Sequence, residues 1–261
     1  NFNTKLILRI SGFPRLNFFR KTLWGKSNKN LFKITCPTLE LLGKLKKKNI
    51  FIQDKLSYLQ DAIIDINEFK SKLSDKNFIS KIDLNKKYLL SIGRFTKQKN
   101  FSYLIKEFFN FSQNFEDLNL VIIGDGEEKT KLEKLIRSKK LENKVFLIGP
   151  TDNVYKYMQH ASLFILPSLW EEVGFVIVEA ALSNLFIISS DCPNGPSEFL
   201  DNGNSGILFK SNVNGELEKI LNFYFENKKK LEDKKIIIKK NSLKYTRFRH
   251  FITLEKILNN N

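Results

Sequence analysis

The sequence predicts an α/β fold built around a parallel sheet, and three observations support that prediction. From about residue 87 onward, short apolar runs alternate with longer amphipathic segments, as in successive strand–helix units. The 261 residues are 42% hydrophobic and 13% aromatic, so the chain can bury a sizeable core and does not belong to the disordered classes. The two cysteines, Cys36 and Cys192, lie far apart, which argues against a disulfide framework or a cysteine metal cluster.

Six strands are expected in the second part of the chain, each a short apolar run. They span residues 88–93, 119–124, 145–149, 163–167, 186–190 and 205–209. Helices are expected at 101–115, 127–140, 152–160 (capped by Asp152) and 174–182, and again after Asn214, ending in 245–258. This pattern predicts a Rossmann-like parallel sheet with helices on both faces, which binds its ligands at the carboxyl ends of the strands.

The first 85 residues predict only an incomplete α/β portion. Strands are expected at 5–10, 34–35 and 50–52, and a helix at 38–48. A linker is expected at about 65–87, where charge is mixed and periodicity fades. The expected domains are therefore residues 1–85 and residues 86–242, followed by a C-terminal helix at 243–261.

Positive charge is concentrated at the two ends of the chain. The net charge is +16, yet residues 1–50 hold twelve Lys or Arg against one acidic residue, whereas residues 151–200 hold one against six. Two interpretations stay open: a basic surface for anionic lipid or a phosphorylated acceptor, or the Lys-, Asn-, Ile- and Phe-rich composition of an A/T-biased genome. Nucleic acid is not an expected partner, because the candidate ligand crevice comes from neutral and acidic segments.

Neither a membrane span nor a signal peptide is expected. No apolar run approaches the roughly 18 residues that a spanning helix needs. Residues 5–10 are too short for the apolar core of a signal peptide. The chain starts at Asn1 rather than Met, so we expect it to be a fragment of a longer protein.

The sharpest chemical feature is a pair of glutamates, Glu171 and Glu179, at the junction between the fourth strand and its helix. Gly174 permits close backbone approach, and the amides that follow it open the helix, where free N–H groups and the helix dipole suit a phosphate. One carboxylate would then meet a neutral hydroxylated group and the other a ribose. The alternative is two solvated glutamates on either side of a buried apolar turn.

A second feature follows the first strand of this regular half. Gly93 and Arg94 precede Lys99 at the start of a helix, which is a plausible phosphate clamp with Arg94 as a fork and Lys99 as a point charge. The alternative is surface cations in a Lys-rich protein. A third feature, Gly124-Asp125-Gly126 after the second strand, indicates a tight turn and is not the full dinucleotide-binding fingerprint.

Together and in this order, the motifs resemble the retaining glycosyltransferases of family four, which have the GT-B fold of two Rossmann-like domains. The resemblance covers roughly residues 85–212. It also implies that the C-terminal helix at 243–261 crosses back to the N-terminal portion. The matching segments are Gly93-Arg94 with Lys99-Asn100, Gly124-Asp125-Gly126, Leu166-Pro167-Ser168, Glu171 with Glu179, the turn from Ser189 to Glu198, and Asn202 with Gly206.

The resemblance implies a role for each matching residue. Arg94 and Lys99, with the turn at Gly93, would bind the donor diphosphate and stabilise the charge that develops on it. Glu171 would contact the donor sugar, and Glu179 would bind the ribose hydroxyls. The amides at Gly174, Phe175 and Val176 would hold phosphate. No metal and no cofactor are expected, because the nucleotide-sugar is itself the donor substrate.

This chain departs from the family pattern in two ways. Glu172 and Val173 stand where the family often has Gly and an aromatic residue, which puts the shape of that loop in doubt. The family also carries a full acceptor domain with a Gly-rich loop and commonly a catalytic His, whereas residues 1–85 resemble only the last part of that domain. His160 ends an expected helix and is expected to be structural, and His250 is expected at the surface of the basic tail.

The resemblance therefore implies a retaining hexosyl- or N-acetylhexosaminyl-type glycosyltransferase that moves a sugar from a nucleotide-sugar to an acceptor hydroxyl. The expected setting is bacterial cell-envelope polysaccharide or lipid-linked oligosaccharide synthesis, with a glycan or lipid-linked acceptor. The chain is expected in the cytoplasm, in peripheral contact with an anionic membrane at its inner face. The alternative is a nucleotide-sugar-binding chain that is inactive because its acceptor domain is truncated.

Overall fold

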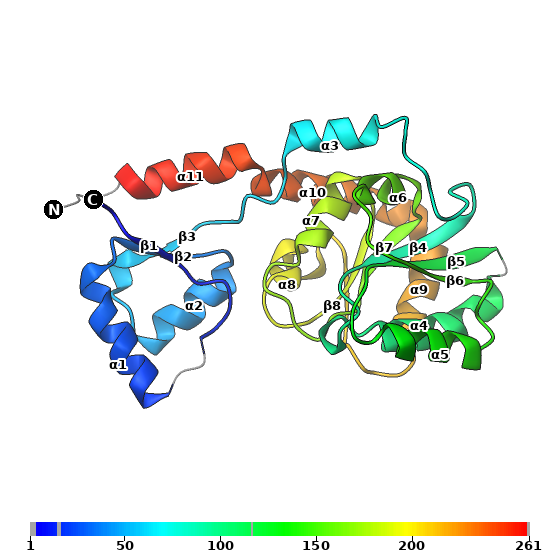
Figure 1. Ribbon diagram of the computed structural model, residues 1–261, viewed down its shortest axis with the longest axis horizontal. Helices are drawn as coiled ribbons and strands as arrows, with labels where there is room; N and C mark the ends of the chain where they lie inside the picture. The colour runs from blue at the N-terminus through cyan, green and yellow to red at the C-terminus, as the bar shows by residue number, and fades with distance from the viewer. Residues whose placement is uncertain (1–3, 15–16, 116, 260–261) are drawn as a thin grey trace. The chain divides into compact units, whose positions relative to one another are not determined.

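The computed structural model describes residues 4–14, 17–115 and 117–259 and contains two compact units (Figure 1). The smaller unit combines residues 1–63 with 244–261, and the larger unit comprises residues 64–243. The first boundary thus lies at 63/64 and not at 85/86. The second lies at 243/244, one residue from the expected position, so the final helix belongs to the smaller unit.

Six parallel strands form the sheet of the larger unit in the order β6-β5-β4-β7-β8-β9. They are β4 (Lys87–Ile92), β5 (Leu118–Ile123), β6 (Val145–Ile148), β7 (Leu163–Leu166), β8 (Ile187–Ser190) and β9 (Ile207–Phe209). Counted from β4, this is the order 3-2-1-4-5-6, so the predicted Rossmann-like fold class is confirmed. The order reverses between β4 and β7, and ligands bind such sheets at the carboxyl ends flanking that point.

Helices cover both faces of this sheet (Figure 1). On one face pack α4 (Phe101–Phe111), α5 (Lys129–Ser138) and α9 (Glu216–Asn227), which share one apolar core with alternate strand residues such as Leu120 and Ile122. On the other lie α6 (Val154–His160), α7 (Phe175–Leu182) and α10 (Glu232–Ser242). Asn153, and not Asp152, caps α6, because its side chain accepts the amide N–H of Lys156 at 3.3 Å.

Residues 64–85 belong with the larger unit because they pack on it. The expected linker contains a helix, α3 (Ile66–Leu73), whose N-cap Asp65 accepts the amides of Asn67 and Glu68. The Phe69 ring packs edge-on against Tyr155 of α6, with 5.0 Å between the ring centroids. The cap and this ring contact stabilise α3.

The smaller unit holds a three-stranded parallel sheet in the order β1-β2-β3. Its strands are β1 (Ile7–Arg9), β2 (Lys33–Cys36) and β3 (Leu56–Tyr58), and its helices are α1 (Phe18–Ser27), α2 (Leu39–Lys48) and α11 (Arg247–Asn259). Thr38 caps α2 by accepting the amide of Leu41. The side chain of Gln60 donates to Thr253 of α11 at 3.2 Å.

One expectation for the smaller unit was wrong. The strand expected at 50–52 lies instead at Leu56–Tyr58, because Phe51 is buried as an anchor that packs edge-on against Trp24. His250 lies on α11 and is half-buried, and its Nδ1 donates to the carbonyl oxygen of Gln60 at 2.6 Å. Within the described ranges, no helix combines the length and apolarity that crossing a bilayer requires.

Candidate functional site

A cleft of about 670 Å³ opens at the carboxyl ends of β4 and β7 in the larger unit. Its walls are the loop after β4, the loop after β7 and the first turns of α7. All eight residues that were predicted to bind the nucleotide-sugar or to act in catalysis line this one cleft: Gly93, Arg94, Lys99, Glu171, Gly174, Phe175, Val176 and Glu179. The geometry brings them together, while the role of each stays a prediction.

The loop after β4 is held by the glycine turn after β5. A Cβ on Gly124 would lie 2.0 Å from the carbonyl oxygen of Gly93, so only glycine permits this approach. The amide of Phe95 donates to the carbonyl of Asp125 at 2.8 Å. The Gly124-Asp125-Gly126 turn therefore supports the Gly93–Lys99 loop and does not line the cleft.

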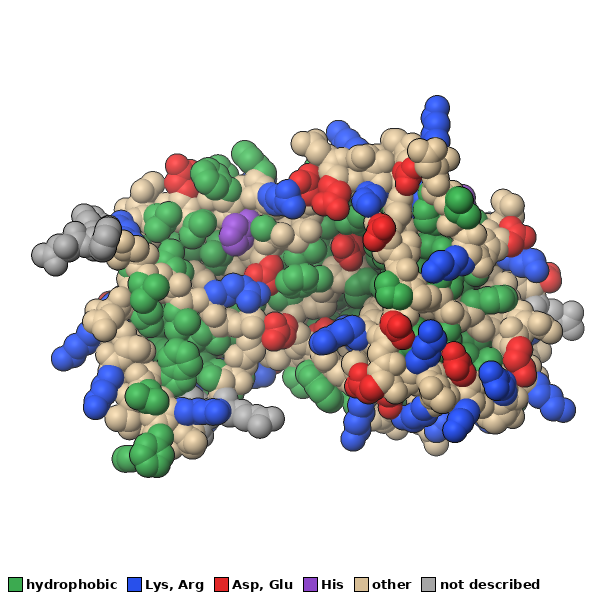
Figure 2. Space-filling model, viewed as in Figure 1, with side chains coloured by type: hydrophobic (Ala, Val, Ile, Leu, Met, Phe, Trp, Pro, Cys, Tyr) green, Lys and Arg blue, Asp and Glu red, His purple; other side chains and the backbone are tan. Residues whose placement is uncertain are grey.

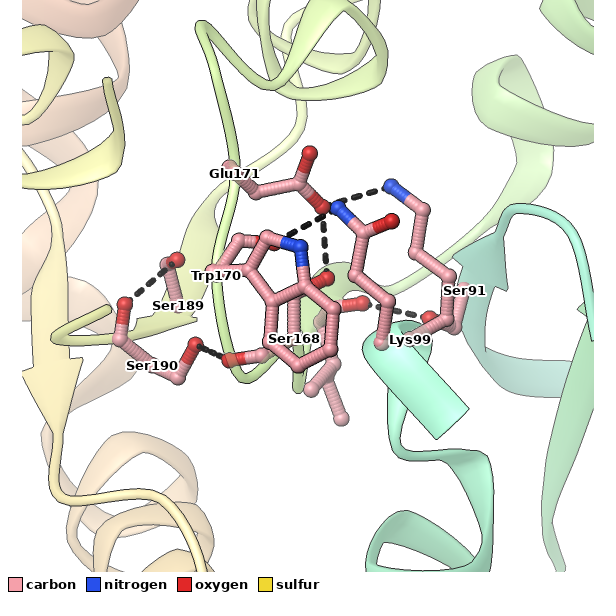
Figure 3. A network of polar contacts seen from close by, with 9 residues as sticks. Ser91, Lys99, Ser168, Trp170, Glu171, Ser189 and Ser190 are labelled. Carbon is pink, nitrogen blue, oxygen red and sulfur yellow. Dashed lines mark hydrogen bonds and ion pairs between the residues drawn. The ribbon is translucent and has the colours of Figure 1, made fainter. Parts of the chain in front are cut away.

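Lys99 and Glu171, which both line the cleft, meet side chain to side chain (Figure 3). Lys99 Nζ lies 2.5 Å from Glu171 Oε1, and the hydroxyl of Ser168 donates to the same oxygen at 2.6 Å. The side chains of Lys99 and Glu171 are only 16% and 8% exposed, so the ion pair is largely desolvated. A buried carboxylate needs such partners, because an unpaired buried charge is strongly destabilising.

The loops that carry this pair are also joined through their backbones. The amide of Leu169 donates to the carbonyl of Gln98 at 2.8 Å, and the side chain of Gln98 donates to the carbonyl of Trp170 at 2.8 Å. These bonds fix the loop after β7 against the loop after β4. Gln98 and Trp170 line the cleft too, although no sequence motif identified them.

The N-terminus of α7 opens into the cleft beside Glu171. Gly174 adopts a left-handed conformation (φ 75°, ψ 58°) that favours glycine, and no side chain caps the helix there. The first amides of a helix have no intrahelical acceptor, so those of Phe175 and Val176 can bind an anion.

Glu179 lines the same cleft from α7, about one turn after the start of that helix. The Tyr155 hydroxyl donates to its Oε1 at 3.4 Å, and no ion pair within the described part of the chain involves it. Burial raises the pKa of Glu179 to about 7, the charge of Glu68 on α3 adds to the rise, and the Tyr155 bond opposes it. Tyr155 comes from α6, and no sequence signal pointed to it.

The remaining residues of the cleft differ in exposure. Arg94 is exposed, and its guanidinium makes no ion pair with any residue that the structure describes. Of the two residues that stand where the family often has Gly and an aromatic residue, Glu172 is exposed at the rim, whereas Val173 is buried. A Cβ on Gly195 would lie 2.5 Å from the Val173 carbonyl oxygen, so the loop is tightly packed there. Neither His160 nor His250 is among the lining residues.

Known proteins similar to this chain include glycosyltransferases from several microbes. An uncharacterised glycosyltransferase of Methanocaldococcus jannaschii is 34% identical over 58% of this chain and 35% of that protein. The Campylobacter jejuni N-acetylgalactosamine-N,N'-diacetylbacillosaminyl-diphospho-undecaprenol 4-alpha-N-acetylgalactosaminyltransferase is 28% identical over 93% of this chain and 69% of that protein.

Solved structures share the fold. TarM of Staphylococcus aureus, in a complex that contains UDP, matches with a TM-score of 0.78 at 18% identity over 99% of this chain and 52% of its own. Anabaena HepE in complex with UDP and glucose matches with a TM-score of 0.79 at 17% identity over 98% of this chain and 72% of its own. The fold is therefore that of GT-B glycosyltransferases, and this chain spans about half the length of TarM.

A family model settles the classification. The model described as "Glycosyl transferases group 1" matches residues 74–241, which contain the whole cleft. The predicted family resemblance is confirmed at this level, and the chain belongs to the glycosyl transferases group 1 family.

Proposed function

We propose that this chain binds a nucleotide-sugar donor in the cleft and belongs to an enzyme that transfers the sugar to an acceptor hydroxyl with retention of configuration. The observation that carries the proposal is the content of the cleft. Two cations, an uncapped helix N-terminus and the carboxylates of Glu171 and Glu179 gather at the point where the strand order reverses.

Each group suits one part of a nucleotide-sugar. Arg94 and Lys99 carry the positive charge that a diphosphate requires, and the amides at the start of α7 add uncharged donors. Glu171 would accept hydrogen bonds from the sugar hydroxyls, and Glu179 from the ribose.

The same groups would assist transfer. As the bond between sugar and diphosphate breaks, negative charge grows on the leaving phosphate, and the two cations and the amides line the cleft where they can bind that charge. The sugar becomes oxocarbenium-like, and the acceptor hydroxyl arrives on the face that the nucleotide leaves. We propose that no metal is required, which is checked by comparing transfer with and without EDTA.

The names of similar proteins support a hexose or N-acetylhexosamine as the sugar and a lipid-linked or glycan acceptor. One relative is named as an N-acetylgalactosaminyltransferase acting on a diphospho-undecaprenol glycan, and another as a poly(ribitol-phosphate) alpha-N-acetylglucosaminyltransferase. We therefore place the reaction in cell-envelope glycan synthesis.

Calorimetric titration with UDP-glucose, UDP-N-acetylglucosamine, UDP-N-acetylgalactosamine and GDP-mannose tests the proposal. We expect at least one to bind, and Lys99→Ala to abolish that binding. Lys97→Ala is the matched control, because Lys97 lies two residues away, is exposed and does not line the cleft. Failure of all four to bind would overturn the proposal.

Binding without transfer is the second candidate function. It is favoured by the fact that neither histidine of the sequence lines the cleft. Release of free sugar from the bound donor, or its transfer to a lipid-linked glycan, would exclude this candidate.

We also propose that the smaller unit contacts the anionic lipids at the inner face of the cell membrane. Helix α1 exposes Phe18 (81%), Phe19 (77%) and Leu23 (67%), and its charged residues are all basic: Arg20, Lys21 and Lys26. Figure 2 shows hydrophobic side chains gathered on the visible face of this unit. Binding to vesicles that contain 30% phosphatidylglycerol, but not to vesicles of phosphatidylcholine alone, would support this contact. Failure to bind either kind of vesicle would refute it.

A further inference from the structure

Ser168 is a buried serine that none of the roles above uses. It follows β7 directly, its side chain is fully buried, and its hydroxyl donates to Glu171 Oε1 at 2.6 Å. Its carbonyl oxygen accepts from the hydroxyl of Ser190 on β8 at 2.5 Å (Figure 3). The serine is thus tied at its backbone to the sheet and at its side chain to the carboxylate in the cleft.

Both partners of Glu171 bind the same oxygen. Lys99 and Ser168 each approach Oε1, and no described residue forms a hydrogen bond with Oε2. In Figure 3 the second oxygen points away from both partners. A carboxylate oxygen has two lone pairs, so Oε2 remains an acceptor for a ligand hydroxyl.

The backbone of Glu171 is held as well. Its amide donates to the carbonyl of Pro193 at 3.4 Å, and its carbonyl accepts from the side chain of Asn194 at 3.2 Å. The main chain is fixed on one side and the carboxylate on the other, so the direction of Oε2 depends on the two bonds to Oε1.

Those two bonds differ in how they respond to a ligand. Lys99 is a flexible cation on a four-carbon stem, and a diphosphate in the cleft competes for it. Ser168 is short, buried and fixed through its own backbone, so a diphosphate cannot draw it away. We propose that Ser168 is a positioning residue that holds the Glu171 carboxylate toward the donor sugar while Lys99 turns to the diphosphate. This inference rests on the proposed function.

The test compares two buried serines. Ser91 on β4 is also fully buried, and its hydroxyl donates to a backbone carbonyl, that of Ile165, at 2.6 Å. Ser168→Ala and Ser91→Ala therefore each remove one buried hydrogen bond, and only the first removes a bond to the carboxylate. Thermal unfolding of both variants measures the shared structural cost.

Titrations use the nucleotide-sugar that the wild-type chain binds most tightly in the panel above, and its nucleoside diphosphate. Ser168→Ala is expected to weaken nucleotide-sugar binding about tenfold and to change nucleoside diphosphate binding less than about threefold. Ser91→Ala is expected to leave both affinities within about twofold. Equal losses for the two ligands, or equal losses in the two variants, would overturn the proposal.

A double-mutant cycle separates positioning from a general effect. If Ser168 acts through Glu171, Ser168→Ala adds nothing to the affinity loss in a Glu171→Gln background, whereas additive losses contradict the proposal. Should Ser168→Ala fail to fold, Ser190→Ala loosens the same serine without removing its hydroxyl, and a sugar-selective loss of about threefold is expected. If the wild-type chain binds nothing, the proposed function fails. If it binds and Ser168→Ala binds equally well, this inference alone fails.

Discussion

Glu171 and Glu179 line the same cleft, but their surroundings differ. The Oε1 atom of Glu171 accepts hydrogen bonds from both Lys99 and the Ser168 hydroxyl. Glu179 is instead desolvated beside a tyrosine, and its pKa rises to about 7. Both residues are glutamates, so the difference comes from the elements that surround each carboxylate. Glu171 faces the loop after β4, whereas Glu179 faces α6 and α3.

The largest expected effect on stability comes from removing Lys99, the cation that pairs with Glu171. Lys99→Ala leaves a buried carboxylate unpaired, so we expect the free energy of unfolding to fall by about 3 to 5 kcal/mol, measured by urea denaturation. The double variant Lys99→Met with Glu171→Gln removes both charges and should recover much of that stability without recovering donor binding. Unchanged stability of Lys99→Ala would show that the pair is not desolvated.

The next largest effect is a pH dependence of stability that is caused by Glu179. Between pH 4.5 and 7 the folded chain retains a proton on Glu179 that the unfolded chain has lost, so this group lowers stability progressively as pH rises. Glu179→Gln should match the wild type near pH 4 and exceed it by up to ~3 kcal/mol at pH 8. Urea denaturation at the two pH values checks this, and a pH-independent difference would contradict it.

Arg94→Ala separates binding from stability. The guanidinium is exposed and forms no ion pair among the described residues, so we expect the unfolding free energy to change by less than about 0.5 kcal/mol. Donor affinity should fall about tenfold, because a bidentate phosphate contact is lost. A stability loss as large as that of Lys99→Ala would contradict the distinction between the two cations.

The smallest effect tests the tyrosine beside Glu179. Tyr155→Phe keeps the ring that packs against Phe69 and removes only the hydroxyl, whose bond lowers the pKa of Glu179. That pKa should rise further, and stability at pH 8 should fall by less than about 1 kcal/mol, with little change at pH 4. A pKa that falls in NMR titration of the side-chain carboxyl would refute the assignment.

Much of the larger unit could be predicted from its sequence. The central strand β7 is buried along its whole length, so it appears as a continuous apolar run, and it was predicted to within one residue. The cleft residues could be predicted because their motifs follow strands whose carboxyl ends meet at one edge of the sheet.

Features that depend on tertiary contacts could not be predicted. Helix α3 has a mixed-charge sequence and is held by Phe69 against Tyr155, a residue far along the chain. Tyr155 reaches Glu179 only because α6 and α7 pack together. The run at 50–52 contains Phe51, whose buried ring packs against Trp24 outside any strand. A short apolar run alone cannot distinguish such a loop residue from a strand.

A crystal structure of this chain with the nucleotide-sugar that binds most tightly tests the central claim most directly. The claim predicts the diphosphate between Arg94, Lys99 and the first amides of α7, with the sugar against Glu171 and the ribose against Glu179. A nucleotide-sugar bound outside this cleft, or bound in it with its diphosphate away from both cations, would contradict the claim.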